Sequence, residues 1–304
     1  MTGHPKIGVA LGGGAARGWA HIGVLTALAE RGVVPQVVSG ASIGALVGAA
    51  LAGGRLAALE EWVVGLRRLD VLKLLDASLG GGVIEGNRVM LAVKDVLRDH
   101  DIESLGCPFG AVATDLQSGR TVWLRDGSTI DAVRASCAMP GLFPPVRHRD
   151  TWLVDGGLVD PVPVTLCRAL GADIVIAVNL SPYRHRQPPN GAEPPAPPGP
   201  AVSPLEERSY VARLQRFVLG VFEPALGDGE RQPALLDVVS SAINIMQERI
   251  TRSRLAGDPP ELEITPNVQD IGMMDFHRAA LAIERGWRAV EDQTDAVARL
   301  IPPA

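Results

Sequence analysis

The fold prediction depends on one stretch, Val37-Val38-Ser39-Gly40-Ala41-Ser42-Ile43-Gly44. Its valines predict a short strand, and the small residues that follow Ser42 are typical of a closely packed helix. Residues 40–44 match the pattern G-x-S-x-G at the turn between the two. A serine on such a turn holds its hydroxyl above the sheet, and Gly40 and Gly44 leave room around a strained backbone. An ordinary helix cap at Ser42 would fit the same five residues.

Other strands and helices alternate around this stretch. Residues 6–11 are a buried apolar run that ends in glycines, and residues 19–31 repeat apolar side chains at helical spacing until Gly32. Further strands are predicted at 109–116, 121–124, 153–154, 173–180 and 261–264. Further helices are predicted at 55–75, 87–100, 128–138, 161–170, 205–222, 233–255 and 275–300. This alternation indicates an α/β fold, a three-layer α/β/α sandwich with a mostly parallel central sheet and its ligands at the carboxyl ends of the strands.

The composition divides the chain into three parts. Residues 5–181 contain all the motifs and are expected to form the core domain. Residues 182–204 are rich in proline and poor in aliphatic side chains, which indicates a flexible insertion. Residues 205–304 are mainly helical by pattern, and we expect them to pack on the same domain.

A glycine loop, Gly12-Gly13-Gly14-Ala15-Ala16-Arg17-Gly18, follows the first predicted strand. A dinucleotide-binding loop would need its third glycine at position 17, where the chain has Arg17, and no Walker lysine follows. The N–H groups of Gly13, Gly14 and Ala15 could instead converge as an oxyanion hole, with Arg17 adding positive charge or anchoring the loop. A plain tight turn is the remaining interpretation.

A carboxylate follows the predicted strand at 153–154, in the triplet Asp155-Gly156-Gly157. Most such triplets are simple turns. The position of this one is more informative, because a nucleophilic serine needs a base and the carboxyl edge of the sheet is where we expect that base.

Histidine is the usual base, and the chain has six: His4, His21, His100, His148, His185 and His277. In a serine-acid-histidine triad of the α/β type, the histidine comes last along the chain. Only His185 and His277 follow Asp155, and neither follows a clear strand. The sequence therefore gives little support to a triad.

Taken together, the motifs at 12–18, 40–44 and 155–157 resemble those of the patatin-like phospholipases, in particular the compact bacterial members. Residues 135–145, Ala-Ser-Cys-Ala-Met-Pro-Gly-Leu-Phe-Pro-Pro, are similar to the segment ahead of that family's catalytic aspartate. The resemblance covers residues 5–180. It implies a serine-aspartate dyad that hydrolyses ester bonds of phospholipids, lysophospholipids or other acyl lipids, with no metal or other cofactor.

Carried over by position, the resemblance makes Ser42 the nucleophile and Asp155 the base, supported by Gly156 and Gly157. Gly12, Gly13, Gly14 and Arg17 match the oxyanion-hole element. Two rivals stay open: a regulatory module that binds nucleotide through Gly12–Gly18, and a non-catalytic scaffold that binds lipid or protein partners.

Charge and cysteine content limit the class of protein. The chain has 29 Lys and Arg against 34 Asp and Glu, a formal net charge of −5, so we expect no nucleic acid partner. Cys107, Cys137 and Cys167 form no CxxC pair, and neither a disulfide framework nor a zinc site is indicated.

Neither a signal peptide nor a membrane span is predicted. The first ten residues have one Lys and only a short apolar run, and no stretch of about 18 uncharged apolar residues occurs. We therefore expect a cytoplasmic protein whose membrane contact is at most peripheral, at the inner surface. The sequence does not indicate an oligomeric state.

The predicted helix at 233–255 has two interpretations. It either packs its apolar stripe on the sheet, or covers the Ser42 cleft as a lid that meets a membrane through that stripe and its arginines. The stripe consists of Leu235, Leu236, Val239, Ile243, Met246 and Ile250, and the arginines are Arg249, Arg252 and Arg254.

Overall fold

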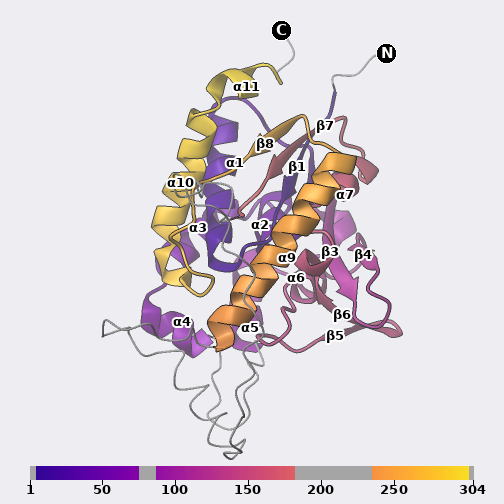
Figure 1. Cartoon of the computed structure of the whole chain (residues 1–304). Coiled ribbons are helices and arrows are strands. Elements are labelled where there is room, and N and C mark those ends of the chain that lie inside the picture. Colours follow the sequence, from indigo (N-terminus) through magenta and orange to yellow (C-terminus); the bar gives the residue numbers. More distant parts are fainter. Residues whose placement is uncertain (1–4, 75–86, 182–234, 301–304) are drawn as a thin grey trace, which may run out of the picture.

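The computed structural model describes residues 5–74, 87–181 and 235–300 (Figure 1). The proline-rich segment at 182–204 and the predicted helix at 205–222 lie outside these residues. The described chain forms one eight-stranded sheet with helices against both faces, so the predicted three-layer α/β/α sandwich is confirmed.

The sheet has a parallel centre and an antiparallel edge. Its order is β5-β6-β3-β2-β1-β7-β8, and β4 pairs with β3 outside this path. β3, β2, β1, β7 and β8 run parallel, whereas β4 and β6 are antiparallel to β3 and β5 is antiparallel to β6. The strands are β1 (Ile7–Leu11), β2 (Val37–Ala41), β3 (Phe109–Asp115), β4 (Thr121–Leu124), β5 (Val146–His148), β6 (Thr151–Asp155), β7 (Ile174–Val178) and β8 (Leu262–Ile264).

Helices cover the two faces of the sheet. The α-helices are α1 (Ala20–Glu30), α2 (Ile43–Ala52), α3 (Leu56–Val64), α4 (Arg68–Leu74), α5 (Asn87–Leu97), α6 (Thr129–Ser136), α7 (Val164–Ala169), α9 (Leu235–Gly257), α10 (Ala279–Glu291) and α11 (Thr294–Ala298). Short 3-10 helices are η1 (Ala15–Trp19), η2 (Ile102–Ser104), η3 (Gly156–Leu158) and η4 (Phe276–Arg278). α10 packs along α1, and α9 crosses the opposite side of the molecule near α7 (Figure 1).

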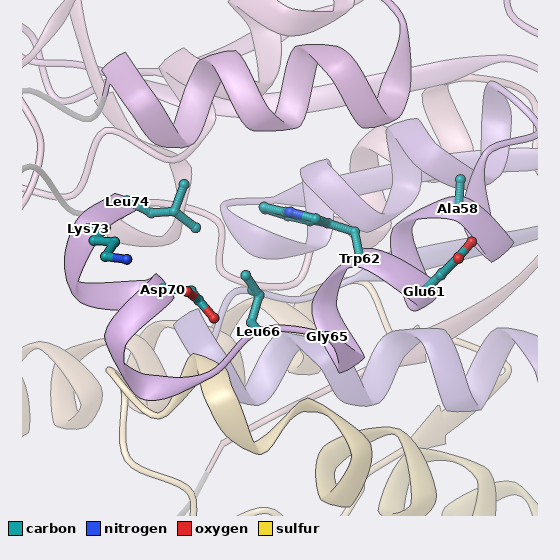
Figure 2. Close-up of a pocket in the computed structure, with 8 residues that line it drawn as sticks. All are labelled: Ala58, Glu61, Trp62, Gly65, Leu66, Asp70, Lys73 and Leu74. Atoms are coloured by element: carbon teal, nitrogen blue, oxygen red, sulfur yellow. The ribbon is translucent and has the colours of Figure 1, made fainter.

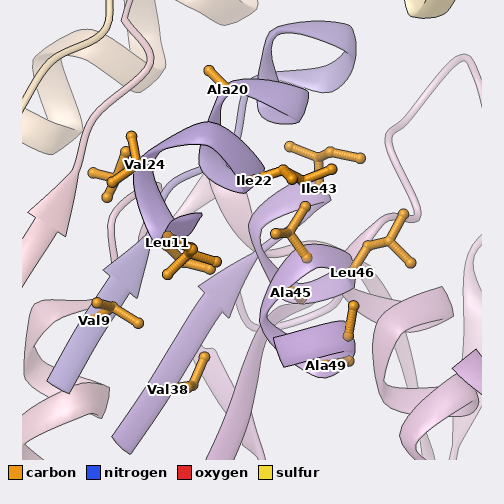
Figure 3. Packing of buried hydrophobic residues seen from close by; sticks show 14 of the residues in the cluster. Val9, Leu11, Ala20, Ile22, Val24, Val38, Ile43, Ala45, Leu46 and Ala49 are labelled. Atoms are coloured by element: carbon orange, nitrogen blue, oxygen red, sulfur yellow. The ribbon is translucent and has the colours of Figure 1, made fainter. Parts of the chain in front are cut away.

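The central strands are buried on both faces. Val9, Leu11 and Val38 pack with α1 and α2 in one core (Figure 3), whereas Ala10 and Val37 face α7 in the other. This division follows from the two-residue period of a strand. Because both faces are covered, these strands have continuous apolar sequences instead of alternating ones.

One predicted helix, 55–75, is interrupted. It forms α3, which ends with Gly65 as its C-cap, and α4, where the carboxylate of Asp70 accepts the Arg67 N–H at 3.2 Å in a new first turn. The segments at 161–170 and 275–300 are likewise shorter or divided, as α7 and as η4, α10 and α11. By contrast, Ser128 caps α6 as predicted, since its Oγ accepts the Asp131 N–H at 3.1 Å.

β6 differs from the expected strand in its direction. It forms an antiparallel pair with β5, a three-residue strand that the sequence pattern does not predict, and runs antiparallel to β3. Asp155 pairs with Ala113, next to Val112, which pairs with Ala41 at the end of β2. β3 continues past the end of β2. The last residue of β6, Asp155, therefore still lies beside Ser42, although β6 runs antiparallel to β3.

A hollow of about 680 Å³ lies at α3 and α4 (Figure 2). Its lining residues are Ala58, Glu61, Trp62, Gly65, Leu66, Asp70, Lys73 and Leu74. None of them is a candidate site residue, and Leu74 is the last described residue before 87.

Candidate active site

Ser42 lies on the sharp turn between β2 and α2. Its backbone has φ 54° and ψ −125°, and a non-glycine residue in a sparsely populated region of this kind carries strain of about 1–3 kcal/mol. The glycines on either side leave the necessary space. A Cβ on Gly40 would lie 2.4 Å from the Ala45 nitrogen, and one on Gly44 would lie 2.1 Å from the Leu11 carbonyl oxygen.

The Ser42 hydroxyl donates a hydrogen bond to the carboxylate of Asp155. The distance from Oγ to Oδ2 is 2.6 Å, and the residues are 8% and 0% exposed. The other carboxylate oxygen, Oδ1, accepts the Gly157 N–H at 2.7 Å, which fixes the rotation of the group. The structure thus brings together the two residues that the sequence proposed as nucleophile and base.

Burial raises the pKa of Asp155 to about 6, although the hydrogen bonds from Ser42 and from the Gly157 N–H act in the opposite direction. At neutral pH this carboxylate is ionised, yet it binds a proton more readily than a free aspartate does. Asp155 is therefore suited to accept the hydroxyl proton of Ser42.

Cys137 lies near the same two residues. Burial raises the pKa of its thiol above the usual range, and the charge of Asp155 raises it further. The thiol therefore stays protonated at neutral pH and is not an activated nucleophile.

The glycine loop passes beside Ser42, but its first two N–H groups are engaged, as are those of Ala16 and Arg17. Gly12 N–H donates to the Val178 carbonyl at 3.0 Å, and Gly13 N–H donates to the Pro161 carbonyl at 2.9 Å. The expected free donor at Gly13 is thus absent from this structure, because Pro161 satisfies it. The Gly14 N–H has no acceptor among the residues that the structure describes, and the first N–H groups of α2 have none within their helix. These are the donors that could face an oxyanion.

Arg17 and His21 hold the loop in place. Arg17 is buried, and its Nη2 donates to Oδ1 of Asn244 on α9 at 2.9 Å. Nε2 of His21 lies 2.7 Å from the Gly12 carbonyl oxygen, to which it must donate because a carbonyl only accepts. Burial lowers the pKa of His21 to about 4, so its ring is neutral.

No histidine in the described part of the chain makes a hydrogen bond to Ser42 or Asp155. His21 bonds to Gly12, and His277 accepts from Nε of Arg68 at 3.0 Å. His148 lies half-buried on β5, and His100 accepts the Thr129 N–H through its backbone carbonyl. His4 and His185 lie outside the described residues.

The end of α6 contacts both members of the pair, which sequence reasoning did not anticipate. Oγ of Ser136 accepts the backbone N–H of Ser42 at 2.8 Å and donates to the Val112 carbonyl at 2.6 Å. Two residues on, the Ala138 carbonyl accepts the Asp155 N–H at 2.9 Å. Both Ser136 and Ala138 lie in the stretch 135–145 that resembles the segment ahead of the family's catalytic aspartate, but that resemblance did not indicate these contacts.

Helix α9 covers the glycine loop from outside. Asn244 bonds to Arg17, and the side chain of Gln247 lies so close to Gly157 that a Cβ there would be 2.5 Å from its Nε2. A cavity of only about 20 Å³ remains between this part of α9 and the loop residues Gly13 and Gly14.

The side of α9 that packs on the site is polar, contrary to the expected apolar stripe. Glu248 and Thr251 are buried there, whereas Met246 is 53% exposed, and Ile243 and Ile250 are only half-buried. The side chains of Leu235, Leu236 and Val239 lie outside the described part. In the described part of α9, the expected stripe is therefore only partly buried, and the choice between a core helix and a lid stays open.

The fold and the site together define a class, an α/β/α protein with a strained serine at a strand-to-helix turn and a buried acid hydrogen-bonded to it. A family model for patatin-like phospholipases matches residues 9–168. The chain belongs to this family, which points to a lipid hydrolase.

Relatives of known sequence support the same assignment. An uncharacterised NTE family protein of Mycobacterium bovis is 34% identical over 95% of this chain and 91% of its own. The mouse patatin-like phospholipase domain-containing protein 7 is 33% identical over 59% of this chain and 14% of its own. The crystal structure of VipD from Legionella pneumophila, at 16% identity, covers 97% of this chain and 67% of that chain with a TM-score of 0.54, which shows the shared fold.

Proposed function

We propose that this protein hydrolyses ester bonds of acyl lipids or phospholipids through a dyad of Ser42 and Asp155. The observation that carries the proposal is the 2.6 Å hydrogen bond from the Ser42 hydroxyl to a buried carboxylate, on a strained turn. Family membership supports the lipid class of the substrate.

In the proposed reaction, Asp155 accepts the hydroxyl proton as Ser42 Oγ attacks the ester carbonyl carbon. The oxyanion of the tetrahedral intermediate is stabilised by the Gly14 N–H and the amino end of α2, where loss of one donor typically costs about 3–4 kcal/mol. The proton passes from Asp155 to the leaving alcohol, and an acyl-serine forms. Water then attacks the acyl-serine with Asp155 again as base, and releases the fatty acid.

A non-catalytic module that binds lipid or nucleotide is the second candidate. The nucleotide version would need free N–H groups in the glycine loop for phosphate. Two of them, on Gly12 and Gly13, already donate to Val178 and Pro161. Family membership and the serine-aspartate contact favour the hydrolase.

The proposed setting is the cytoplasm, with peripheral contact to the inner membrane surface. None of the helices in the described part of the chain is long and apolar enough to cross a bilayer.

A fluorophosphonate probe and a soluble p-nitrophenyl ester test the proposal. We expect the wild-type protein to be labelled and to release p-nitrophenol, and Ser42→Ala to do neither. Ser39→Ala serves as the matched control, because Ser39 is buried on the same strand but donates to the Pro163 carbonyl instead of Asp155. Labelling that persists in Ser42→Ala would overturn the assignment, and a wild-type protein that resists the probe would favour the binding module.

A further inference from the structure

The described part of α9 buries polar side chains against the protein and leaves several apolar ones in solvent, although Ile243 and Ile250 are half-buried and Leu255 packs on the core beside α7. Val238, Ile245 and Met246 are 46%, 50% and 53% exposed. Ala242 and Arg249 are exposed on the same side, since these positions are one or two turns apart along the helix. We call these five residues the outward face of α9.

The inward side carries polar side chains and joins the rest of the protein through Asn244, which accepts from Arg17. The bond from Thr251 Oγ1 to the Gln247 carbonyl, at 2.8 Å, lies within α9 itself. Glu248 is buried, with Arg252 Nε donating to its Oε1. A helix that folded only in water would gain more by burying its apolar residues and exposing these polar ones.

Single exposed apolar side chains are common on proteins, but a group of them on one helix face indicates a surface that binds something. The charge beside the group indicates what it binds. Arg249 is exposed and Arg252 lies one turn from it, whereas the only acidic residue of α9 from 241 to 257 is the buried Glu248. An apolar patch bordered by arginines matches a lipid surface with anionic head groups, despite the net charge of −5 for the whole chain.

We infer that the outward face of α9 docks the protein on an anionic lipid surface. This inference deepens the proposed function, on which its choice of a lipid partner rests. The same helix contacts Arg17 and Gly157 through its inward side. Docking through α9 therefore places the Ser42 site next to the surface that holds its substrate.

The test is vesicle co-sedimentation with full-length protein carrying Ser42→Ala, so that no lipid is consumed. Vesicles contain phosphatidylcholine alone or phosphatidylcholine with phosphatidylglycerol. We expect binding to the mixed vesicles, and a loss of roughly tenfold or more in Ile245→Asp/Met246→Asp, because two apolar anchors are removed and two negative charges are added. Val34→Asp/Leu69→Asp is the matched control, since both residues are more exposed (68%) and lie off α9; it should bind as well as the parent.

A charge reversal tests the electrostatic part. Arg249→Glu should weaken binding to the mixed vesicles by roughly fivefold or more, since each arginine at an anionic surface contributes on the order of 1 kcal/mol. It should leave binding to phosphatidylcholine alone nearly unchanged. Arg288→Glu, an exposed arginine on α10, is the control and should have no effect.

Equal binding of Ile245→Asp/Met246→Asp and its parent would overturn the inference. So would a large fall in its melting temperature, which would show that these side chains are buried in the folded protein. Hydrolysis of the soluble ester separates this inference from the proposed function. Ester turnover without vesicle binding contradicts only the docking face, and vesicle binding without ester turnover contradicts only the hydrolase.

Discussion

The Ser42 turn and helix α9 meet at one site but are held in opposite ways. The turn is confined by the close approach of neighbouring backbone to Gly40 and Gly44, and Ser42 has a strained conformation. α9 lies on the same site through side-chain hydrogen bonds and leaves apolar residues in solvent. The candidate site is thus rigid, whereas the helix beside it is held mainly by polar contacts. Substitutions at the Ser42 turn should lower activity, whereas substitutions on α9 should lower mainly stability.

The largest expected effect follows from Asp155→Asn, which should lower kcat by roughly a thousandfold or more, because the base is gone. The free energy of unfolding should instead rise at neutral pH. Burial raises the folded pKa of Asp155 to about 6 from 3.8. The stability linked to this group is therefore fully present below pH 3.8 and is lost as pH rises through 6. Asparagine cannot ionise, so at pH 7 the variant should be more stable, by at most about 3 kcal/mol.

Ester turnover and thermal unfolding at pH 4 and pH 7 measure both effects. Ser42→Ala is the control: it should be as inactive as Asp155→Asn, and the double variant should be hardly worse, because the two residues act as a unit. Full activity in Asp155→Asn would refute the assigned base.

The pH dependence of the wild-type rate comes next in size. Because Asp155 must be ionised to act as a base, kcat/KM should be level above pH 7 and fall about tenfold per pH unit below pH 6. Asp160 offers a matched control, since burial raises its pKa to about 6 as well, but it makes no contact with Ser42. Asp160→Asn should keep the wild-type pH profile of kcat/KM. A changed profile in this variant would contradict the assignment of Asp155 as the base that sets it.

A smaller effect, about 10- to 100-fold in kcat, is expected for Ser136→Ala. The substitution leaves the buried N–H of Ser42 without its acceptor and frees the strained turn to move away from Asp155. Ser136→Thr retains the hydroxyl and should recover most of the rate. Ser128→Ala, at the cap of the same helix, should cost about 1 kcal/mol of stability with kcat unchanged. An equal loss of kcat in both variants would show that Ser136 acts only through stability.

Much of the rigid region could be predicted from sequence, because its requirements are local. Glycines at 40 and 44, an apolar run before them and small residues after them specify a strand, a tight turn and a packed helix. The direction of β6 could not be predicted, because it depends on pairing with β3 and on β5, which has only three residues. The engagement of the Gly13 N–H by Pro161 likewise depends on a contact distant in sequence.

The orientation of α9 could not be predicted for a related reason. Periodicity identifies the helix and its apolar stripe, but the choice of the buried side depends on partners elsewhere in the chain. Arg17 donates a hydrogen bond to Asn244, and Gly157 leaves room for the side chain of Gln247. These contacts oppose the preference that hydrophobicity alone would give.

The smallest expected effect concerns helix α9, where a substitution should raise activity instead of lowering it. Asn244→Ala removes the 2.9 Å hydrogen bond that joins α9 to Arg17. A hydrogen bond to a charged group is worth about 1.5–3 kcal/mol, so the melting temperature should fall by several degrees. Because α9 leaves a cavity of only about 20 Å³ beside Gly13 and Gly14, we expect a substrate to displace this part of the helix, and a weaker contact should raise kcat/KM for the soluble ester by about two- to tenfold. Asn179→Ala is the matched control: it removes a 2.9 Å side-chain bond to Glu263 and should lower the melting temperature without raising kcat/KM. A fall in kcat/KM in Asn244→Ala would instead mean that Asn244 holds Arg17 and the glycine loop in their active positions.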